Sequence, residues 1–167
     1  MKIRGPARIL GDEVSTELML PISALLLPLE EQAERLLGGA MAGEVSISGD
    51  DDILLAGTGF GVGSARPAAR VLRAAGVGAV VALSVSQTFL RGAVNYGLAC
   101  FEYAAGETVL AAADGASVVV DIAARVVRNV DTGDARHLGS FPGTLEAAML
   151  GGGTLDRLVA EGLVRPL

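Results

Sequence analysis

Cysteine, histidine and aromatic residues are scarce in this chain. Its 167 residues include one cysteine and one histidine, and aromatic residues make up 4% of the sequence. A lone cysteine cannot form an internal disulfide, and with one histidine it cannot ligate zinc or an iron–sulfur cluster within a single copy. We therefore expect this chain to hold no metal, so that any metal centre has to come from another polypeptide.

Basic runs and long apolar runs are missing as well. The net charge is −6, which argues against a nucleic-acid partner. No apolar stretch reaches the roughly 18 residues of a membrane span. Residues 1–6 are not followed by the apolar region of a secretory signal. Because Cys100 has no cysteine to pair with, the cytoplasm is the expected location.

A glycine-rich segment, residues 57–67, is the most informative part of the chain. It lies between a short apolar run at 53–56, typical of a strand, and residues 68–76, whose apolar residues recur at helical spacing. Alternating glycines let the backbone approach a ligand closely. We expect Ser64 at the helix N-cap, where free N–H groups attract an anion, and Arg66 beside it to suit a carboxylate or a phosphate. The segment predicts a small anionic ligand held by Ser64, Arg66 and backbone amides.

Two common phosphate-binding motifs do not fit this segment. Whichever of Gly57, Gly59 or Gly61 opens a dinucleotide fingerprint, another residue type stands at the third glycine position. No Lys-Ser or Lys-Thr pair follows, which excludes a phosphate loop of the Walker kind. An ordinary tight turn from strand to helix remains an alternative.

The order of elements predicts a single α/β domain, residues 1–167, with a mixed sheet. A parallel centre is expected from alternating strands and helices at 53–56, 68–76, 77–83, 87–96 and 98–103. Antiparallel strands are expected after it at 108–112, 117–122 and 125–130, followed by short helices at 145–150 and 155–161.

The remaining elements are shorter. We expect a strand at 2–10 and a helix at 29–37, closed by the glycine pair 38–39. Residues 22–28 are apolar but bracketed by prolines, which predicts a loop or single turn that faces the core, a partner or a substrate alkyl group. Residues 50–52 are assigned to a solvated turn. His137 is assigned to a polar turn, with a solvated or structural role.

Three sequence blocks, in this order, resemble one known family. Residues 11–21 are similar to a Gly-Asp-x-x-x-Thr-Asp-x-x-x-Pro block, and residues 57–66 fall where the family has Asn-Phe-Gly-Cys-Gly-Ser-Ser-Arg. Residues 84–102 fall on a third block, Ser-Phe-Ala-x-Ile-Phe-x-x-Asn-x-x-Asn-x-Gly-Leu-Pro. The chain resembles the small subunit of 3-isopropylmalate dehydratase, which is equivalent to the swivelling β/β/α domain of aconitase.

This resemblance implies a heteromeric hydro-lyase in which a large subunit carries a [4Fe–4S] cluster and the substrate is a small di- or tricarboxylate. Carried over by position, Ser64 matches the serine that abstracts a proton beside a carboxylate. Arg66 matches the arginine that holds a substrate carboxylate, with backbone amides of Gly61 and Gly63 assisting. The nearest named activity, 3-isopropylmalate dehydratase, belongs to leucine biosynthesis.

Several polar positions of the family pattern are filled by apolar or small residues here. Ala65 stands for its second serine, Pro67 and Ala68 for a Glu-His pair, and Gly92 for an asparagine. The residues after Pro21 carry no cation before Arg35, although the family's substrate-selecting loop lies there. Two further hypotheses follow: a non-catalytic swivel subunit that closes or stabilises its partner, and a free-standing nucleotide-binding module.

Overall fold

The computed structural model describes residues 1–36, 47–49 and 51–165. Seven strands form one mixed sheet in the order β4-β3-β2-β1-β5-β6-β7. The strands are β1 (Lys2–Ile9), β2 (Asp52–Ala56), β3 (Val77–Ala82), β4 (Ala99–Glu102), β5 (Ser117–Asp121), β6 (Val126–Asn129) and β7 (Ala135–His137). The helices are α1 (Thr16–Met19), α2 (Leu29–Arg35), α3 (Ala68–Ala74), α4 (Gln87–Tyr96), α5 (Gly143–Leu150) and α6 (Thr154–Ala160), with a 3₁₀ turn at Ile22–Ala24.

Strand β1 joins a parallel and an antiparallel half of the sheet. Residues 7–9 of β1 pair in parallel with β2, and residues 2–6 pair antiparallel with β5. Strands β2, β3 and β4 are parallel to one another, whereas β5, β6 and β7 are antiparallel. The predicted α/β fold with a parallel centre and antiparallel C-terminal strands is confirmed.

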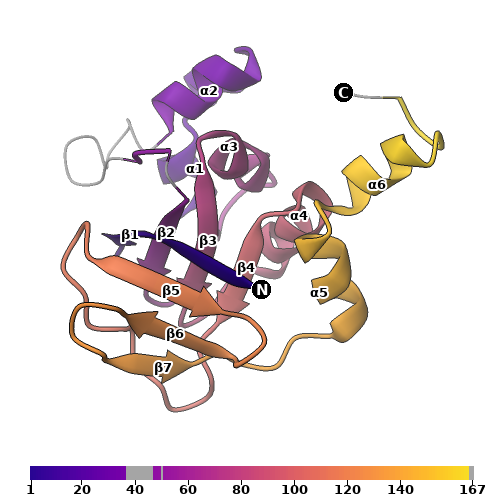
Figure 1. Cartoon of the computed structure of the whole chain (residues 1–167). Helices are drawn as coiled ribbons and strands as arrows, with labels where there is room; N and C mark the ends of the chain where they lie inside the picture. The colour runs from indigo at the N-terminus through magenta and orange to yellow at the C-terminus, as the bar shows by residue number, and fades with distance from the viewer. Residues whose placement is uncertain (37–46, 50, 166–167) are drawn as a thin grey trace.

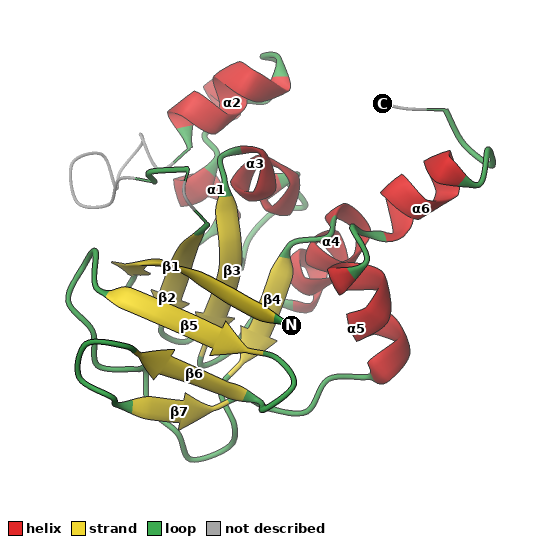
Figure 2. Cartoon of the chain, viewed as in Figure 1, coloured by secondary structure: helices red, strands yellow, loops and turns green. Residues whose placement is uncertain are grey.

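The helices cover the parallel half. Figure 1 shows β5, β6 and β7 on the side of the molecule away from α2, α3 and α6, and Figure 2 shows the same division by element type. Helix α4 packs against α3 and α5. Strand β2 is buried along its whole length, whereas burial alternates along β5, as expected for a strand with one solvated face.

One of the three predicted antiparallel strands is wrong. Residues 108–112 form no strand: Leu110 is buried in a loop, and its N–H donates to the Tyr103 hydroxyl at 3.1 Å. The strand is instead β7, which includes His137 of the predicted polar turn. A side-chain hydroxyl satisfies the Leu110 amide, so this apolar run does not need a ladder of backbone hydrogen bonds.

Asp52 was predicted to lie in a solvated turn, and this prediction is also wrong. Its side chain is fully buried in β2, where it accepts from Arg8 Nε at 2.5 Å. It also accepts from the Ser48 and Gly49 amides at 2.8 and 3.0 Å. The free-energy cost of burying a carboxylate is offset here because an arginine and several N–H groups donate hydrogen bonds to it. Residues 38, 39 and 50 lie outside the described residues.

Around the 3₁₀ turn, one element was predicted from the sequence and another, helix α1, was not. The single turn at Ile22–Ala24 is confirmed, with Ala24 buried and Ile22 75% exposed. Helix α1 was missed because it has only four residues; Ser15 caps it by accepting from Leu18 N. The predicted helix at 29–37 is present over Leu29–Arg35. Among the described residues, no helix combines the length and the apolar character that crossing a bilayer requires.

Candidate functional site

Two loops continue the β1–β2 pairing beyond the carboxyl ends of the strands. Residues 11–16 run beside residues 57–62, and four backbone hydrogen bonds tie them together: Gly57 N to Gly11 O, Glu13 N to Thr58 O, Gly61 N to Val14 O and Thr16 N to Val62 O. Asp12 adds a carboxylate oxygen that accepts from Thr58 N at 2.6 Å. The glycine-rich segment is therefore held rigidly against the first block of the sequence, although far from it in the chain.

Ser64 does not cap helix α3, contrary to the sequence-based expectation. The helix begins at Ala68, its N-cap position is Pro67, and no side chain caps it. Gly63, with φ of +107°, turns the chain away from a helical path before Ser64, and Pro67 has no N–H to be capped. With seven residues, α3 is short, and its amino end is not where Ser64 lies. The prediction that Ser64 caps this helix is therefore wrong.

Ser64 instead meets the carboxylate of Glu17 and the guanidinium of Arg66. Glu17 Oε1 accepts from Ser64 N at 2.9 Å and also from the Ser64 hydroxyl. Arg66 Nε donates to Ser64 Oγ at 3.1 Å and lies 3.6 Å from Glu17 Oε1. Arg66 Nη1 donates to the Leu20 carbonyl, which fixes the direction of the guanidinium. The structure therefore brings the two predicted site residues together and adds a third.

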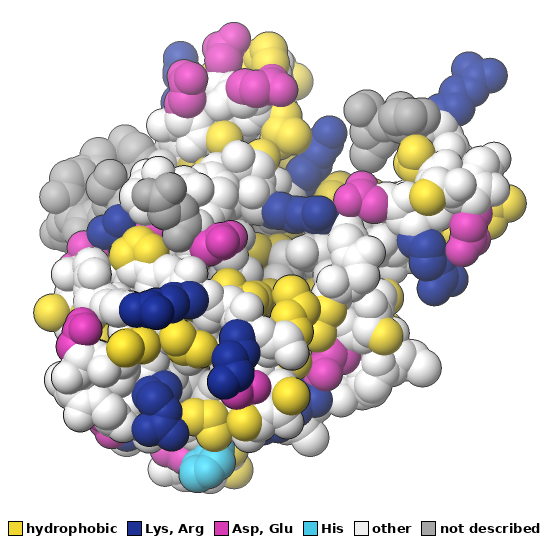
Figure 3. All heavy atoms as spheres, in the orientation of Figure 1, with side chains coloured by type: hydrophobic (Ala, Val, Ile, Leu, Met, Phe, Trp, Pro, Cys, Tyr) yellow, Lys and Arg dark blue, Asp and Glu magenta, His cyan; other side chains and the backbone are white. Residues whose placement is uncertain are grey.

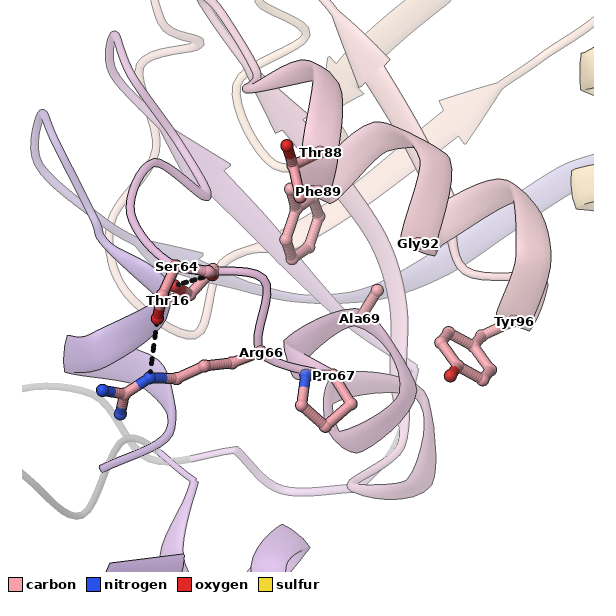
Figure 4. Close-up of a pocket in the computed structure, with 9 residues that line it drawn as sticks. All are labelled: Thr16, Ser64, Arg66, Pro67, Ala69, Thr88, Phe89, Gly92 and Tyr96. Carbon is pink, nitrogen blue, oxygen red and sulfur yellow. Dashed lines mark hydrogen bonds between the residues drawn. The ribbon is translucent and has the colours of Figure 1, made fainter. Parts of the chain in front are cut away.

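Thr16 holds the backbone of Ser64 in place through a hydrogen bond. Thr16 is 3% exposed, and its hydroxyl donates to the Ser64 carbonyl at 2.8 Å (Figure 4). The Arg66 side chain is 15% exposed, so it is mostly enclosed while its partners Ser64 and Glu17 remain accessible. Helix α1 thus supplies both a buried hydroxyl and a carboxylate to the glycine-rich loop.

Glu17 is ionised throughout the physiological pH range. Hydrogen bonds from the Ser64 hydroxyl, and then from the Ser64 amide, lower the pKa of Glu17 to about 2. Glu17 was not among the residues predicted for the site. The signal was its position in the first block, where the family pattern has an aspartate, but nothing in the sequence shows that this carboxylate meets Ser64.

The glycines of the loop allow close contacts. Gly61 has φ of +73°, and a Cβ there would lie 2.4 Å from Phe89 Cβ. A Cβ on Gly63 would lie 2.1 Å from Glu17 Oε2. The Gly61 N–H donates to Val14 O, so it is not free for a ligand as the sequence suggested. The Gly63 N–H has no acceptor among the described residues.

A small pocket opens beside Ser64 and Arg66, between their loop and helix α4 (Figure 4). Its lining residues come from α1, the glycine-rich loop, α3 and α4. They are Thr16, Ser64, Arg66, Pro67, Ala69, Thr88, Phe89, Gly92 and Tyr96. The site therefore has a polar edge at Ser64 and Arg66 and a mostly apolar hollow next to it.

The chain's own residues do not fit an iron–sulfur cluster. Cys100 is the sole cysteine, it is fully buried in β4, and burial raises the pKa of its thiol. His137, predicted to be solvated or structural, lies in β7 with its side chain 74% exposed and its Nδ1 3.0 Å from Glu107 Oε1.

On the face shown in Figure 3, positive and negative side chains are interspersed.

Comparison with known proteins gives a consistent result. The chain is 32% identical to 3-isopropylmalate dehydratase small subunit 1 of Methanopyrus kandleri, over 96% of this chain and 94% of that protein. It is also 32% identical to the methanogen homoaconitase small subunit of Methanothermobacter thermautotrophicus, over 92% and 89% of the two chains. A crystal structure of 3-isopropylmalate dehydratase from Methanocaldococcus jannaschii superposes with a TM-score of 0.82 at 26% identity, covering 98% and 96%. No family model matches the chain.

The fold, together with these relatives, defines the class of protein: the small subunit of a heteromeric hydro-lyase, which acts with a large subunit. Within that class, the chain belongs to the 3-isopropylmalate dehydratase small-subunit family. The resemblance found in the three sequence blocks is confirmed.

Proposed function

We propose that this chain, joined to a cluster-bearing large subunit, dehydrates and rehydrates a substituted malate, with 3-isopropylmalate as the nearest named substrate. The names of the relatives support the substrate class. One geometric observation carries the roles of this chain's residues: Arg66 Nε lies 3.1 Å from Ser64 Oγ, beside an open pocket.

Ser64 is the proposed base. Dehydration removes a proton from a carbon next to a carboxylate. Ser64 Oγ would accept that proton as an alkoxide, after its own hydroxyl proton has passed to Glu17 Oε1, the oxygen to which the hydroxyl donates. A serine hydroxyl is a weak base, so its alkoxide form needs a cation and hydrogen-bond donors beside it. Arg66 Nε already donates to this oxygen. The loop thus provides the charge that the alkoxide requires.

Arg66 is the proposed clamp for a substrate carboxylate. Two of its nitrogens are used, Nε by Ser64 and Nη1 by the Leu20 carbonyl, and Nη2 has no acceptor among the described residues. A guanidinium presents its donors in one plane, so the nitrogen that remains can bind a carboxylate while the others keep its orientation. The Gly63 amide is the proposed second donor, and Gly61 contributes its conformation.

The cluster belongs to the proposed large subunit, where it supplies Lewis-acid chemistry at the leaving hydroxyl. This chain supplies the proton acceptor and the carboxylate contact. We place the complex in the cytoplasm, because cluster ligands of the thiolate type persist where thiols stay reduced.

The test is to express the chain with its large subunit and to measure formation of the unsaturated diacid from 3-isopropylmalate. Ser64→Ala is expected to lower kcat about 10²- to 10⁴-fold, the usual contribution of a positioned base. Arg66→Ala is expected to raise KM as well. Ser140→Ala, at an exposed serine outside the site, is the matched control. Full activity of the isolated chain, or of the Ser64→Ala complex, would contradict the proposal.

One observation favours the second hypothesis, a swivel subunit that stabilises or closes its partner without doing chemistry. Glu17 occupies the Ser64 amide and hydroxyl, two groups that a substrate would otherwise contact. Under this hypothesis the Ser64→Ala and Arg66→Ala complexes assemble and turn over like the wild type. Nucleotide binding, the third hypothesis, is tested by calorimetry with ATP and NAD, where we expect no heat of binding.

A further inference from the structure

We propose that the pocket between the glycine-rich loop and helix α4 receives an apolar substituent of the substrate, and that Gly92 keeps this pocket open. The inference rests on the proposed function, and it deepens that function by assigning a substrate group to a place in the fold. No cation is needed in such a subsite, which separates it from the carboxylate contacts of Arg66.

The position of the pocket suits a substituent on the reacting carbon or its neighbour. Ser64 and Arg66 lie at one side of it, and Phe89, Gly92 and Tyr96 of α4 form the opposite side (Figure 4). A substrate whose carboxylate binds Arg66 and whose acidic proton faces Ser64 therefore has one further group that can point towards α4.

The chemistry of the lining favours an alkyl group over a third carboxylate. Pro67, Ala69 and Phe89 present carbon, and Thr16, Thr88 and Tyr96 add hydroxyls without charge. Arg66 is the one cation among the lining residues, and its guanidinium is directed away from Phe89 and Tyr96 (Figure 4). A carboxylate in the hollow would lose water without gaining a cation, whereas an alkyl group gains from leaving water.

Gly92 controls the size of the pocket. The open space has a volume of about 30 Å³, which is room for roughly two water-sized groups and comparable to the two methyls of a branched substituent. A Cβ on Gly92 would lie 3.5 Å from Ala69 Cβ, an ordinary contact. An alanine at position 92 therefore fits without displacing its neighbours, and it takes volume only from the pocket.

Two of the four positions where this chain is less polar than its family pattern lie at the same hollow. Pro67 stands where the pattern has glutamate and Gly92 where it has asparagine, and both line the pocket. Both changes remove a polar side chain, and the second leaves open the space that a side chain would fill. Neither Pro67 nor Gly92 brings a polar side chain to the pocket.

The experiment compares the complex of this chain and its large subunit on 3-isopropylmalate and on 3-methylmalate. Gly92→Ala is expected to raise KM for 3-isopropylmalate about 10-fold, and Gly92→Leu about 100-fold, within the usual discrimination for one or more methylenes in an apolar pocket. KM for 3-methylmalate should change less than about 2-fold, since one methyl needs only about half of the pocket. Gly143→Ala, at a helical glycine with no atom near the added Cβ, is the matched control.

The outcomes separate the two proposals. If the wild-type complex turns over neither malate, the proposed function fails and the pocket assignment falls with it. If it turns over both and neither Gly92 variant changes the ratio of the two KM values, the pocket assignment alone is wrong. A wild-type preference for a malate with a carboxylate-bearing substituent also overturns it. Alanine is a better helix former than glycine, so Gly92→Ala decides the matter even if Gly92→Leu fails to fold.

Discussion

Two arginine–carboxylate pairs lie at opposite ends of the β1–β2 pair, and they differ in how completely they are satisfied. At the amino end of β2, Asp52 is fully buried and accepts from Arg8, from the Ser48 amide and hydroxyl, and from the Gly49 amide. At the carboxyl ends, Glu17 is 39% exposed and shares Ser64 with Arg66.

The difference separates a structural pair from a site. The Asp52 carboxylate is fully buried, so a ligand could reach it only by breaking the fold. Around Glu17 the Gly63 amide and Arg66 Nη2 keep no acceptor among the described residues, and a pocket adjoins them. Chemistry requires groups that can exchange partners, so incomplete satisfaction and partial exposure together support the proposed site at the carboxyl ends of the strands.

The largest expected change is the fall in the free energy of unfolding when the buried pair of Arg8 and Asp52 is removed. Asp52→Ala leaves Arg8, which is 13% exposed, without its closest carboxylate. It also leaves the amides of Ser48 and Gly49 without the acceptor that they have in the wild type. Unfolding in urea should show a loss of about 3–5 kcal/mol. Asp114, the half-exposed second partner of Arg8, is the control, and Asp114→Ala should cost at most about 1 kcal/mol. Equal losses for the two variants would show that burial does not distinguish these contacts.

A smaller loss is expected from the glycine that lets the site loop approach α4. Gly61→Ala forces a side chain into a positive φ and against Phe89, 2.4 Å from its Cβ. Thermal or urea unfolding should show a loss of about 2–3 kcal/mol. Gly106 also has a positive φ but open space around it, so Gly106→Ala isolates the backbone strain at about 1 kcal/mol. Similar values for both variants would mean that the contact with Phe89 yields easily.

The next expected effect is on substrate binding. Glu17→Gln keeps an oxygen that can accept from Ser64 N but removes the negative charge beside Arg66. In the complex, an anionic substrate should then bind with a KM about 2- to 5-fold lower, as expected for a half-exposed charge. Steady-state kinetics at low and high salt would measure this, and the difference should shrink in salt. An increase in KM would instead mean that the charge of Glu17 helps to hold the substrate.

The smallest expected effect is on the acid dependence of stability. Because the pKa of Glu17 falls from its ordinary 4.5 to about 2 on folding, its contribution is complete above pH 4.5 and is lost as the pH falls towards 2. The wild type should therefore lose more stability than Glu17→Gln between pH 5.5 and pH 3, as measured by thermal unfolding. Parallel pH profiles would contradict the hydrogen bonds from Ser64 as the cause.

The parallel half of the fold was predictable because each element has a strong local pattern. Residues 77–83 form a continuous apolar run, and α4 begins at the Ser86 cap and ends at Gly97, whose φ is +70°. The antiparallel half was less predictable. Residues 108–112 have strand composition, yet their polar groups bond to Tyr103 and Asn129 side chains that only the tertiary structure brings near.

Two residues of the candidate site could be selected from the sequence, but their geometry could not. Ser64 and Arg66 stand out from their neighbours, and the structure places them together. The expected helix cap failed because Gly63 and Pro67 prolong the loop, which a single Ser-x-Arg spacing does not reveal. Glu17 was missed because its partner is remote in sequence, and its contact depends on how the two loops pair.

The division of β1 between two partners has a consequence for biosynthesis. As the nascent chain leaves the ribosome, residues 7–9 can find β2 early, whereas residues 2–6 wait until β5 at Ser117–Asp121 has emerged. Until then the first strand has a bare edge that other chains can pair with. Pairing with another chain at this edge is thus expected before residues 117–121 have left the ribosome, and not after β5 has paired with β1.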